Sequence, residues 1–126
     1  MNDKELEELI GGLTQELRRG TIVIGVLSQL SKATYGYSLV SMLEEKGVQV
    51  DPGTLYPLLR RLEKQGLLES RWDTNEARPR KYYALSGAGR IVYERLCGEW
   101  RRIAEGINGM INANEGVDPN ERERND

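Results

Sequence analysis

The sequence has no histidine and no phenylalanine, and it has one cysteine, Cys97. A single cysteine excludes an intrachain disulfide and any metal centre built from several thiolates. Without histidine the chain also lacks the commonest zinc ligand and the general base of Ser-His-Asp catalysis. No apolar run approaches the roughly 18 residues of a membrane-spanning helix, and the acidic N-terminus does not resemble a signal peptide. We therefore expect a cytoplasmic binding protein that is not an enzyme, has no metal or cofactor and does not contact a membrane.

The 18 basic and 20 acidic side chains are unevenly distributed along the 126 residues. Residues 54–90 carry eight basic and four acidic groups, whereas residues 1–20 carry three and five. Residues 91–126 carry five basic and eight acidic groups. The net charge of −2 thus conceals one positive central segment with negative flanks. We expect a polyanion to be attracted to that segment alone.

The N-terminal third predicts two helices. Apolar residues recur at spacings of three and four within residues 1–20, which predicts an amphipathic helix, weakened or bent at the glycine pair 11–12. Residues 21–30 are apolar nearly all round and predict a separate buried helix, with a short strand as the alternative. Residues 32–34 are expected to form a loop.

Two more helices are predicted in the centre of the chain. The first ends at Gly47, a residue type that suits the left-handed position after a helix. The second begins at Asp51, an N-cap acceptor followed by proline, and continues to about residue 65 with its leucines facing inward. Pro57 leaves two alternatives: this helix begins nearer Thr54, or its first turn is distorted.

The C-terminal half predicts a hairpin and a long helix. Residues 67–72 and 81–85 are β-like, and the polar segment between them contains turn formers. Ser86 is the expected N-cap of a helix over residues 87–112, while 113–126 is nearly devoid of apolar residues and is expected to be disordered. Apolar residues of this helix are spaced by three and four, close to a coiled-coil seam. These predicted dimerisation residues are Val92, Leu96, Trp100, Ile103, Ile107 and Met110.

Three helices followed by a hairpin is the order of a winged helix-turn-helix. The fold is therefore expected to be mainly α, with this domain over residues 21–86 between an N-terminal helix and a C-terminal dimerisation helix. The outer face of the helix at 52–65 would enter the major groove, with the basic hairpin tip on the backbone or minor groove. The predicted DNA-binding residues are Tyr37, Thr54, Tyr56, Arg60, Arg61, Lys64, Arg78, Arg80 and Lys81. The alternative is that these charged residues only form a solvent-exposed helix face and a solvent-exposed loop, and that Tyr37 serves in packing and does not contact a phosphate.

Three segments resemble the PadR family of bacterial transcriptional regulators. They are YGY at residues 35–37, PGTLYPLLRRLEKQGLLES at 52–70 and RPRKYYALSGAGR at 78–90. The resemblance covers about residues 13–112. It implies a winged-helix homodimer that represses transcription by binding palindromic operator DNA and is released by a small molecule. By position, it makes the segment 54–64 the recognition helix, 67–85 the wing and 87–112 the dimerisation helix.

The single C-terminal helix is similar to that of the short-tailed branch of this family. Some short members are multidrug-binding regulators in which paired tryptophans line a flat pore at the dimer interface, and Trp100 stands at the matching place. The resemblance thus implies a small apolar or aromatic effector. The predicted ligand-binding residues are Leu13, Leu17, Tyr93, Leu96, Trp100 and Ile103. The alternative is that Trp100 only packs, and the glycines at 98, 106 and 109 depart from a regular seam.

We therefore expect a homodimeric repressor whose partners are double-stranded operator DNA and a small aromatic effector. The alternative is a dimeric protein-interaction module without specific DNA binding. Salt-sensitive DNA binding distinguishes the two, because only the first neutralises phosphates.

Overall fold

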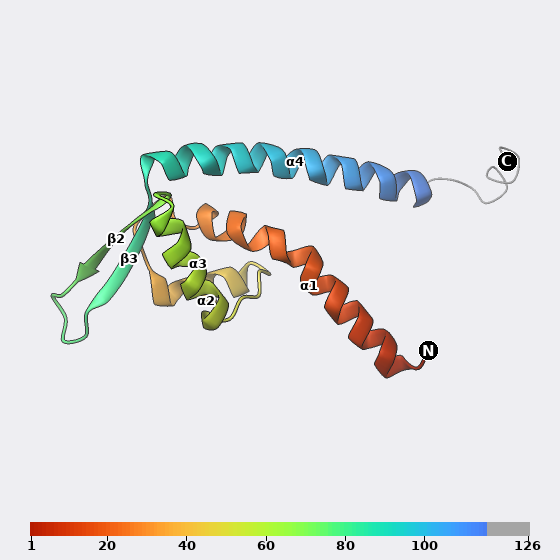
Figure 1. The fold of residues 1–126 in the computed structure, drawn as a ribbon, viewed down its shortest axis with the longest axis horizontal. Helices are drawn as coiled ribbons and strands as arrows, with labels where there is room; N and C mark the ends of the chain where they lie inside the picture. The colour runs from red at the N-terminus through yellow and green to blue at the C-terminus, as the bar shows by residue number, and fades with distance from the viewer. Residues whose placement is uncertain (116–126) are drawn as a thin grey trace, which may run out of the picture. The chain divides into compact units, whose positions relative to one another are not determined.

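The computed structural model describes residues 1–115, which form four helices and a three-stranded antiparallel sheet (Figure 1). In chain order the elements are α1 (Asp3–Ser28), β1 (Thr34–Tyr35), α2 (Gly36–Glu45), α3 (Pro52–Lys64), β2 (Leu68–Asp73), β3 (Arg80–Leu85) and α4 (Gly87–Glu115). The chain divides into two compact units, residues 1–93 and residues 94–126. The expected mainly α architecture with a small antiparallel sheet is confirmed. Within residues 1–115, no helix has the length and apolar character needed to cross a bilayer.

The helix α1 is continuous where the sequence predicted two helices. It starts at an Asn2 cap, whose side-chain oxygen accepts the Glu5 amide hydrogen at 2.8 Å, and runs through residues 18–20 without a break. The glycines of this segment weaken a helix by roughly 0.5–1 kcal/mol each, but α1 contains no proline that would end it. Its last turns are anchored by the buried Val26 and Leu27, whereas its N-terminal part extends away from α2 and α3 (Figure 1).

The ends of α2 and α3 lie where local signals predicted them. Gly47 and Gly66 follow the two helices with φ angles of +85° and +83°, which only glycine adopts without strain. Asp51 caps α3, because its Oδ1 accepts the Thr54 amide hydrogen at 2.8 Å. The helix begins at Pro52, so a start nearer Thr54 is wrong, and Pro57 lies inside it.

The sheet has the strand order β1-β3-β2. The pair β2–β3 is the predicted hairpin, with register from Leu68 opposite Leu85 to Asp73 opposite Arg80. The two-residue strand β1 was not predicted, because a loop was expected at residues 32–34, and it pairs Thr34 with Tyr83. The hairpin, with its tip at residues 74–79, is called the wing below, and its tip projects away from α2 and α3 (Figure 1).

Leucines from α1, α2, α3 and the sheet form the core of the first unit. The buried apolar residues are Val26, Leu27, Leu30, Leu39, Leu43, Leu55, Leu58, Leu59, Leu62, Leu68, Tyr83 and Leu85. All four leucines predicted to face inward from α3 are among them. Because α3 is held by one face, its opposite face is left exposed.

The start of α4 is fixed tightly against the chain that precedes β2. The Ser86 hydroxyl accepts the Gly89 amide hydrogen at 3.0 Å and donates to the Gly66 carbonyl oxygen at 2.6 Å, which confirms the predicted cap. A Cβ at Gly89 would collide with the carbonyl oxygen of Leu67. The helix continues to Glu115, so disorder from residue 113 is wrong for 113–115, and the rest of that expected tail lies outside the described residues.

Candidate nucleic-acid interface

The exposed face of α3 carries a row of cations. Arg60, Arg61 and Lys64 are all exposed, and none of them is ion-paired within residues 1–115. Thr54 is also exposed, nearly two turns before this row, where it lies beside the Asp51 cap. An unpaired guanidinium or ammonium group can bind a phosphate or a base edge without first breaking an internal contact.

Aromatic side chains from α2, α3 and the sheet surround a cleft beside this row. The cleft has a volume of about 350 Å³. We call it the aromatic cleft; its lining residues are Tyr35, Gly36, Tyr37, Tyr56, Arg60, Trp72, Pro79, Lys81 and Tyr83. It brings together four of the predicted DNA-binding residues, which come from three separate segments of the sequence.

The YGY segment forms one wall of the aromatic cleft. The rings of Tyr35 and Tyr37 are stacked with centroids 6.0 Å apart, and Tyr37 is largely exposed. A Cβ at Gly36 would lie 3.0 Å from the Tyr83 ring, so a side chain at this position would require the ring to shift by a few tenths of an ångström. Tyr83 is buried and Tyr82 is half-buried, because neighbouring side chains point to opposite faces of a strand.

Tyr56 is half-buried, although the sequence placed it on the free face of α3. Burial raises the pKa of its phenol above the usual value, and the nearby Tyr37, Tyr35 and Tyr83 raise it further. A tyrosine phenol is protonated at neutral pH in any case, and the upward shift of the pKa extends that range to more alkaline pH.

The three predicted wing cations have different environments. Arg78 at the tip is exposed, and no ion pair involves it in the described part of the chain. Arg80 pairs with Glu76 at 3.1 Å, and its guanidinium carbon lies 5.2 Å from the centroid of the Tyr35 ring. The ammonium nitrogen of Lys81 lies 3.6 Å from the Glu63 carboxylate, so Lys81 is not a free cation.

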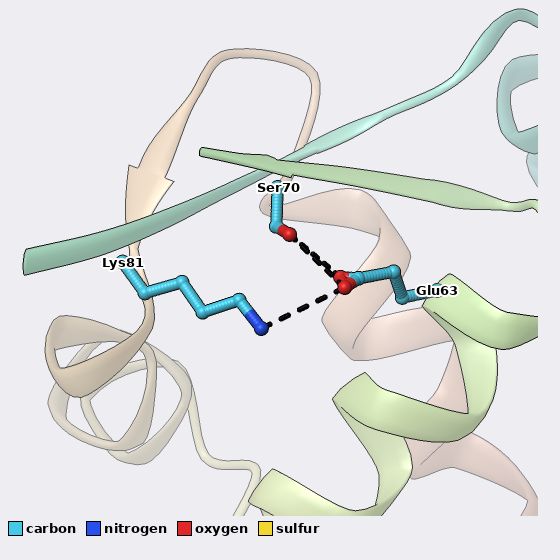
Figure 2. A network of polar contacts seen from close by, with 3 residues as sticks. All are labelled: Glu63, Ser70 and Lys81. Atoms are coloured by element: carbon cyan, nitrogen blue, oxygen red, sulfur yellow. Dashed lines mark hydrogen bonds and ion pairs between the residues drawn. The ribbon is translucent and has the colours of Figure 1, made fainter. Parts of the chain in front are cut away.

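Glu63, Trp72 and Tyr35 are the residues of this surface that sequence reasoning missed. Figure 2 shows Glu63 of α3 bound both by Lys81 and by the Ser70 hydroxyl. No local pattern pairs a helix residue with a strand 18 positions later, so this contact had no signal in the sequence. For Tyr35 the signal was its place in the YGY segment.

The predicted ligand-binding and dimerisation residues lie on α1 and α4. Leu13 and Leu17 are exposed on α1, while Val92, Tyr93 and Leu96 are half-buried. Further along α4 the exposed apolar residues include Trp100, Ile103, Ile107 and Met110, and Trp100 is 47% exposed. Helix periodicity places Leu96, Trp100 and Ile103 on one side of α4.

Comparisons with known proteins agree with this geometry. Residues 23–95 match the model of the transcriptional regulator PadR-like family. The chain is similar to the transcriptional regulator Rv3488 of Mycobacterium tuberculosis, at 36% identity over 62% of this chain and 74% of that protein. It is also similar to the crystal structure of a PadR family transcriptional regulator from Eggerthella lenta, with 41% identity and a TM-score of 0.81 over 86% of this chain and 96% of that one. A PadR-like transcriptional regulator from Bacillus cereus has 27% identity and a TM-score of 0.69 over 76% and 96% of the two chains.

Proposed function

Because this chain belongs to the PadR-like family of transcriptional regulators, we propose that it is a repressor that binds palindromic operator DNA as a homodimer. The observation that carries the proposal is the row of exposed cations on α3, Arg60, Arg61 and Lys64, which have no ion pair among residues 1–115. An α-helix fits the major groove of B-DNA, which is about 12 Å wide. Arginine in that groove reads guanine edges or holds phosphates, and lysine holds phosphates.

The wing and the tyrosines extend this surface. Arg78 at the exposed tip and Arg80 behind it reach the backbone or the adjacent minor groove. The hydroxyls of Tyr37 and Tyr56 donate hydrogen bonds to phosphate oxygens. The Thr54 hydroxyl, which donates weakly to Asp51 Oδ2 at 3.4 Å, would exchange that acceptor for a phosphate. These contacts fix the register of the protein on the duplex, and the α3 arginines supply the sequence readout.

Dimerisation is supported by apolar residues that each unit leaves exposed. On α1 they are Leu6, Leu9, Ile10, Leu13 and Leu17, and on α4 they include Trp100, Ile103, Ile107 and Met110. Apolar rows of this length on a soluble protein mark interaction surfaces. A Cβ at Gly98, Gly106 or Gly109 would meet no atom of the described residues within 4 Å, which leaves room for the close approach of a second helix. A two-fold dimer places its α3 helices about 34 Å apart, one turn of DNA.

The same interface is the proposed effector site. On α4, Trp100 provides one large flat ring beside the apolar Leu96, Ile103 and Tyr93. In the proposed dimer, Leu13 or Leu17 from the first helix of the second copy would be their neighbours. A planar aromatic compound stacked on that ring would gain roughly 0.5–1.5 kcal/mol beyond its area burial. Such a compound changes DNA affinity only if it binds the DNA-competent and DNA-incompetent dimers unequally.

A fluorescence anisotropy titration with the duplex upstream of the gene tests DNA binding. We expect Arg60→Ala and Arg61→Ala to weaken binding and to reduce the slope of log K against log salt by about 0.9 for each phosphate that the variant no longer neutralises. Lys4→Ala is the matched control, because it removes one exposed cation from the first turn of α1. Equal effects of all three variants would refute the assignment of α3 to the DNA.

Light scattering combined with size-exclusion chromatography tests the dimer. Ile103→Glu is expected to convert the dimer to monomers by placing a carboxylate on the apolar row, whereas Asn108→Glu, an exposed polar position on the same helix, is the control. A wild-type monomer that binds the operator at full strength would refute the dimer.

Tryptophan fluorescence tests the effector site. In a Trp72→Phe background, the emission of Trp100 should change when planar aromatic compounds are added. Constant emission across a panel of such compounds would refute the site.

A further inference from the structure

One carboxylate joins the recognition helix to both strands of the wing (Figure 2). The Ser70 hydroxyl on β2 donates its one hydrogen to the Glu63 carboxylate, with its oxygen 2.6 Å from Oε2 and 3.0 Å from Oε1. The Lys81 ammonium on β3 lies 3.6 Å from Oε1. Neighbouring strands of the hairpin are therefore attached at the same point of α3, close to its C-terminal end.

The Lys81 side chain is enclosed by this arrangement. Its ammonium nitrogen lies 5.1 Å from the Tyr83 ring centroid and 5.8 Å from the Trp72 ring centroid, both within the range of a cation–π contact. Its side chain is 28% exposed. A lysine that already has a carboxylate partner gives little counterion release on DNA binding, because its charge is compensated before the phosphate arrives.

We propose that Glu63 is a positioning residue for DNA recognition, which fixes the wing to α3 and keeps Lys81 away from the phosphate backbone. This inference rests on the proposed DNA-binding function. A negative charge beside a DNA-binding helix repels phosphates, so its direct electrostatic effect opposes binding. Glu63 favours operator binding by holding α3 and the wing in one relative position, which sequence-specific contacts require. Non-specific binding depends mainly on charge and does not need that fixed position.

The direction in which a substitution changes DNA affinity and the operator-to-unrelated ratio distinguishes the electrostatic effect from the geometric one. Glu63→Gln and Ser70→Ala each weaken the attachment, and Ser70→Ala does so without a change in net charge. Glu69→Gln is the matched control, because Glu69 is an exposed acid on the same strand as Ser70. Fluorescence anisotropy measures the affinity of each variant for the duplex that wild-type protein selects from random DNA and for an unrelated duplex of equal length.

We expect Glu69→Gln to raise both affinities by the same factor, with an unchanged ratio of operator to unrelated binding. Glu63→Gln should raise the affinity for the unrelated duplex and steepen its salt slope by about 0.9 for each lysine released. The operator-to-unrelated ratio should fall by about twofold to fivefold per protomer in Glu63→Gln, the range that one exposed ion pair supports, and it should also fall in Ser70→Ala. Lys81→Met added to Glu63→Gln should return the salt slope to the wild-type value.

An unchanged ratio in both Glu63→Gln and Ser70→Ala would overturn the proposal, as would a steeper salt slope that persists in the double variant with Lys81→Met. A wild-type protein without salt-dependent DNA binding would instead refute the proposed function itself. Glutamine can still accept the Ser70 hydrogen bond, so Glu63→Gln is expected to unfold at nearly the wild-type temperature. If Glu63→Gln unfolds at a clearly lower temperature, the operator-to-unrelated affinity ratio of the charge-neutral Ser70→Ala variant is the deciding measurement.

Discussion

Replacing Gly89 with alanine tests the close approach of the start of α4 to the Leu67 backbone. The new Cβ would collide with the Leu67 carbonyl oxygen and would lie 3.3 Å from Cδ2 of Leu85. Because the obstacle is backbone, the start of α4 must move and lengthen two hydrogen bonds: the 3.0 Å bond from the Gly89 amide to the Ser86 hydroxyl, and the 3.0 Å bond from the Ser86 amide to the Leu67 carbonyl. Overpacking costs about 1–3 kcal/mol and each weakened bond about 1, against a gain of about 1 for removing a helical glycine. We expect a net loss of roughly 2–4 kcal/mol in the free energy of unfolding.

Urea unfolding followed by far-ultraviolet circular dichroism measures this loss. Protein concentration must be kept constant, because the stability of the proposed dimer would depend on it. Gly87→Ala is the matched control: it lies two residues earlier in the same turn, and a Cβ there would meet no atom within 4 Å in the part of the chain that the structure describes. A Gly89→Ala protein as stable as the Gly87→Ala protein would refute the close approach of α4 to Leu67.

Three further predictions concern α3. Asp51→Ala removes the N-cap and should lower the free energy of unfolding by about 1 kcal/mol; an unchanged urea midpoint would contradict the cap. Leu59→Ala, at a fully buried position, should cost about 2–5 kcal/mol in the same assay, and a loss below about 1 kcal/mol would indicate a looser core. The raised pKa of Tyr56 means that the unfolded chain loses this proton first, so stability should fall as pH rises above about 10 and continue to fall until it passes the folded pKa. Tyr56→Phe should have a shallower decline over this range, and identical pH profiles would contradict the shift.

Features with local causes were predictable from the sequence. The end of α2 at Gly47, the cap of α3 at Asp51 and the cap of α4 at Ser86 each depend on a few neighbouring residues, so the residue types alone indicate them. The hairpin was predicted within one residue at each strand end for the same reason. The free face of α3 followed from the spacing of its leucines, which fixes the inward side and therefore the outward one.

Features that depend on distant residues were not predictable. The strand β1 exists because Thr34 pairs with Tyr83, a partner far along the chain. Lys81 has the sequence context of a free wing cation, because its Glu63 partner belongs to another element. The continuity of α1 through residues 18–20 has no local signal, since Gly20 favours a break. The buried final turns of α1 support the helix instead.

The position of β3 between β1 and β2 has a consequence for how such a protein diversifies. The strand β3 is paired with β1 on one side and with β2 on the other, whereas residues 74–79 connect β2 and β3 without belonging to either. Insertions or deletions in that loop would change how far the wing reaches along a duplex and leave every strand pairing intact. The length of this loop can therefore vary, in evolution or by design, and change how far the wing extends along the DNA without disturbing the leucine core.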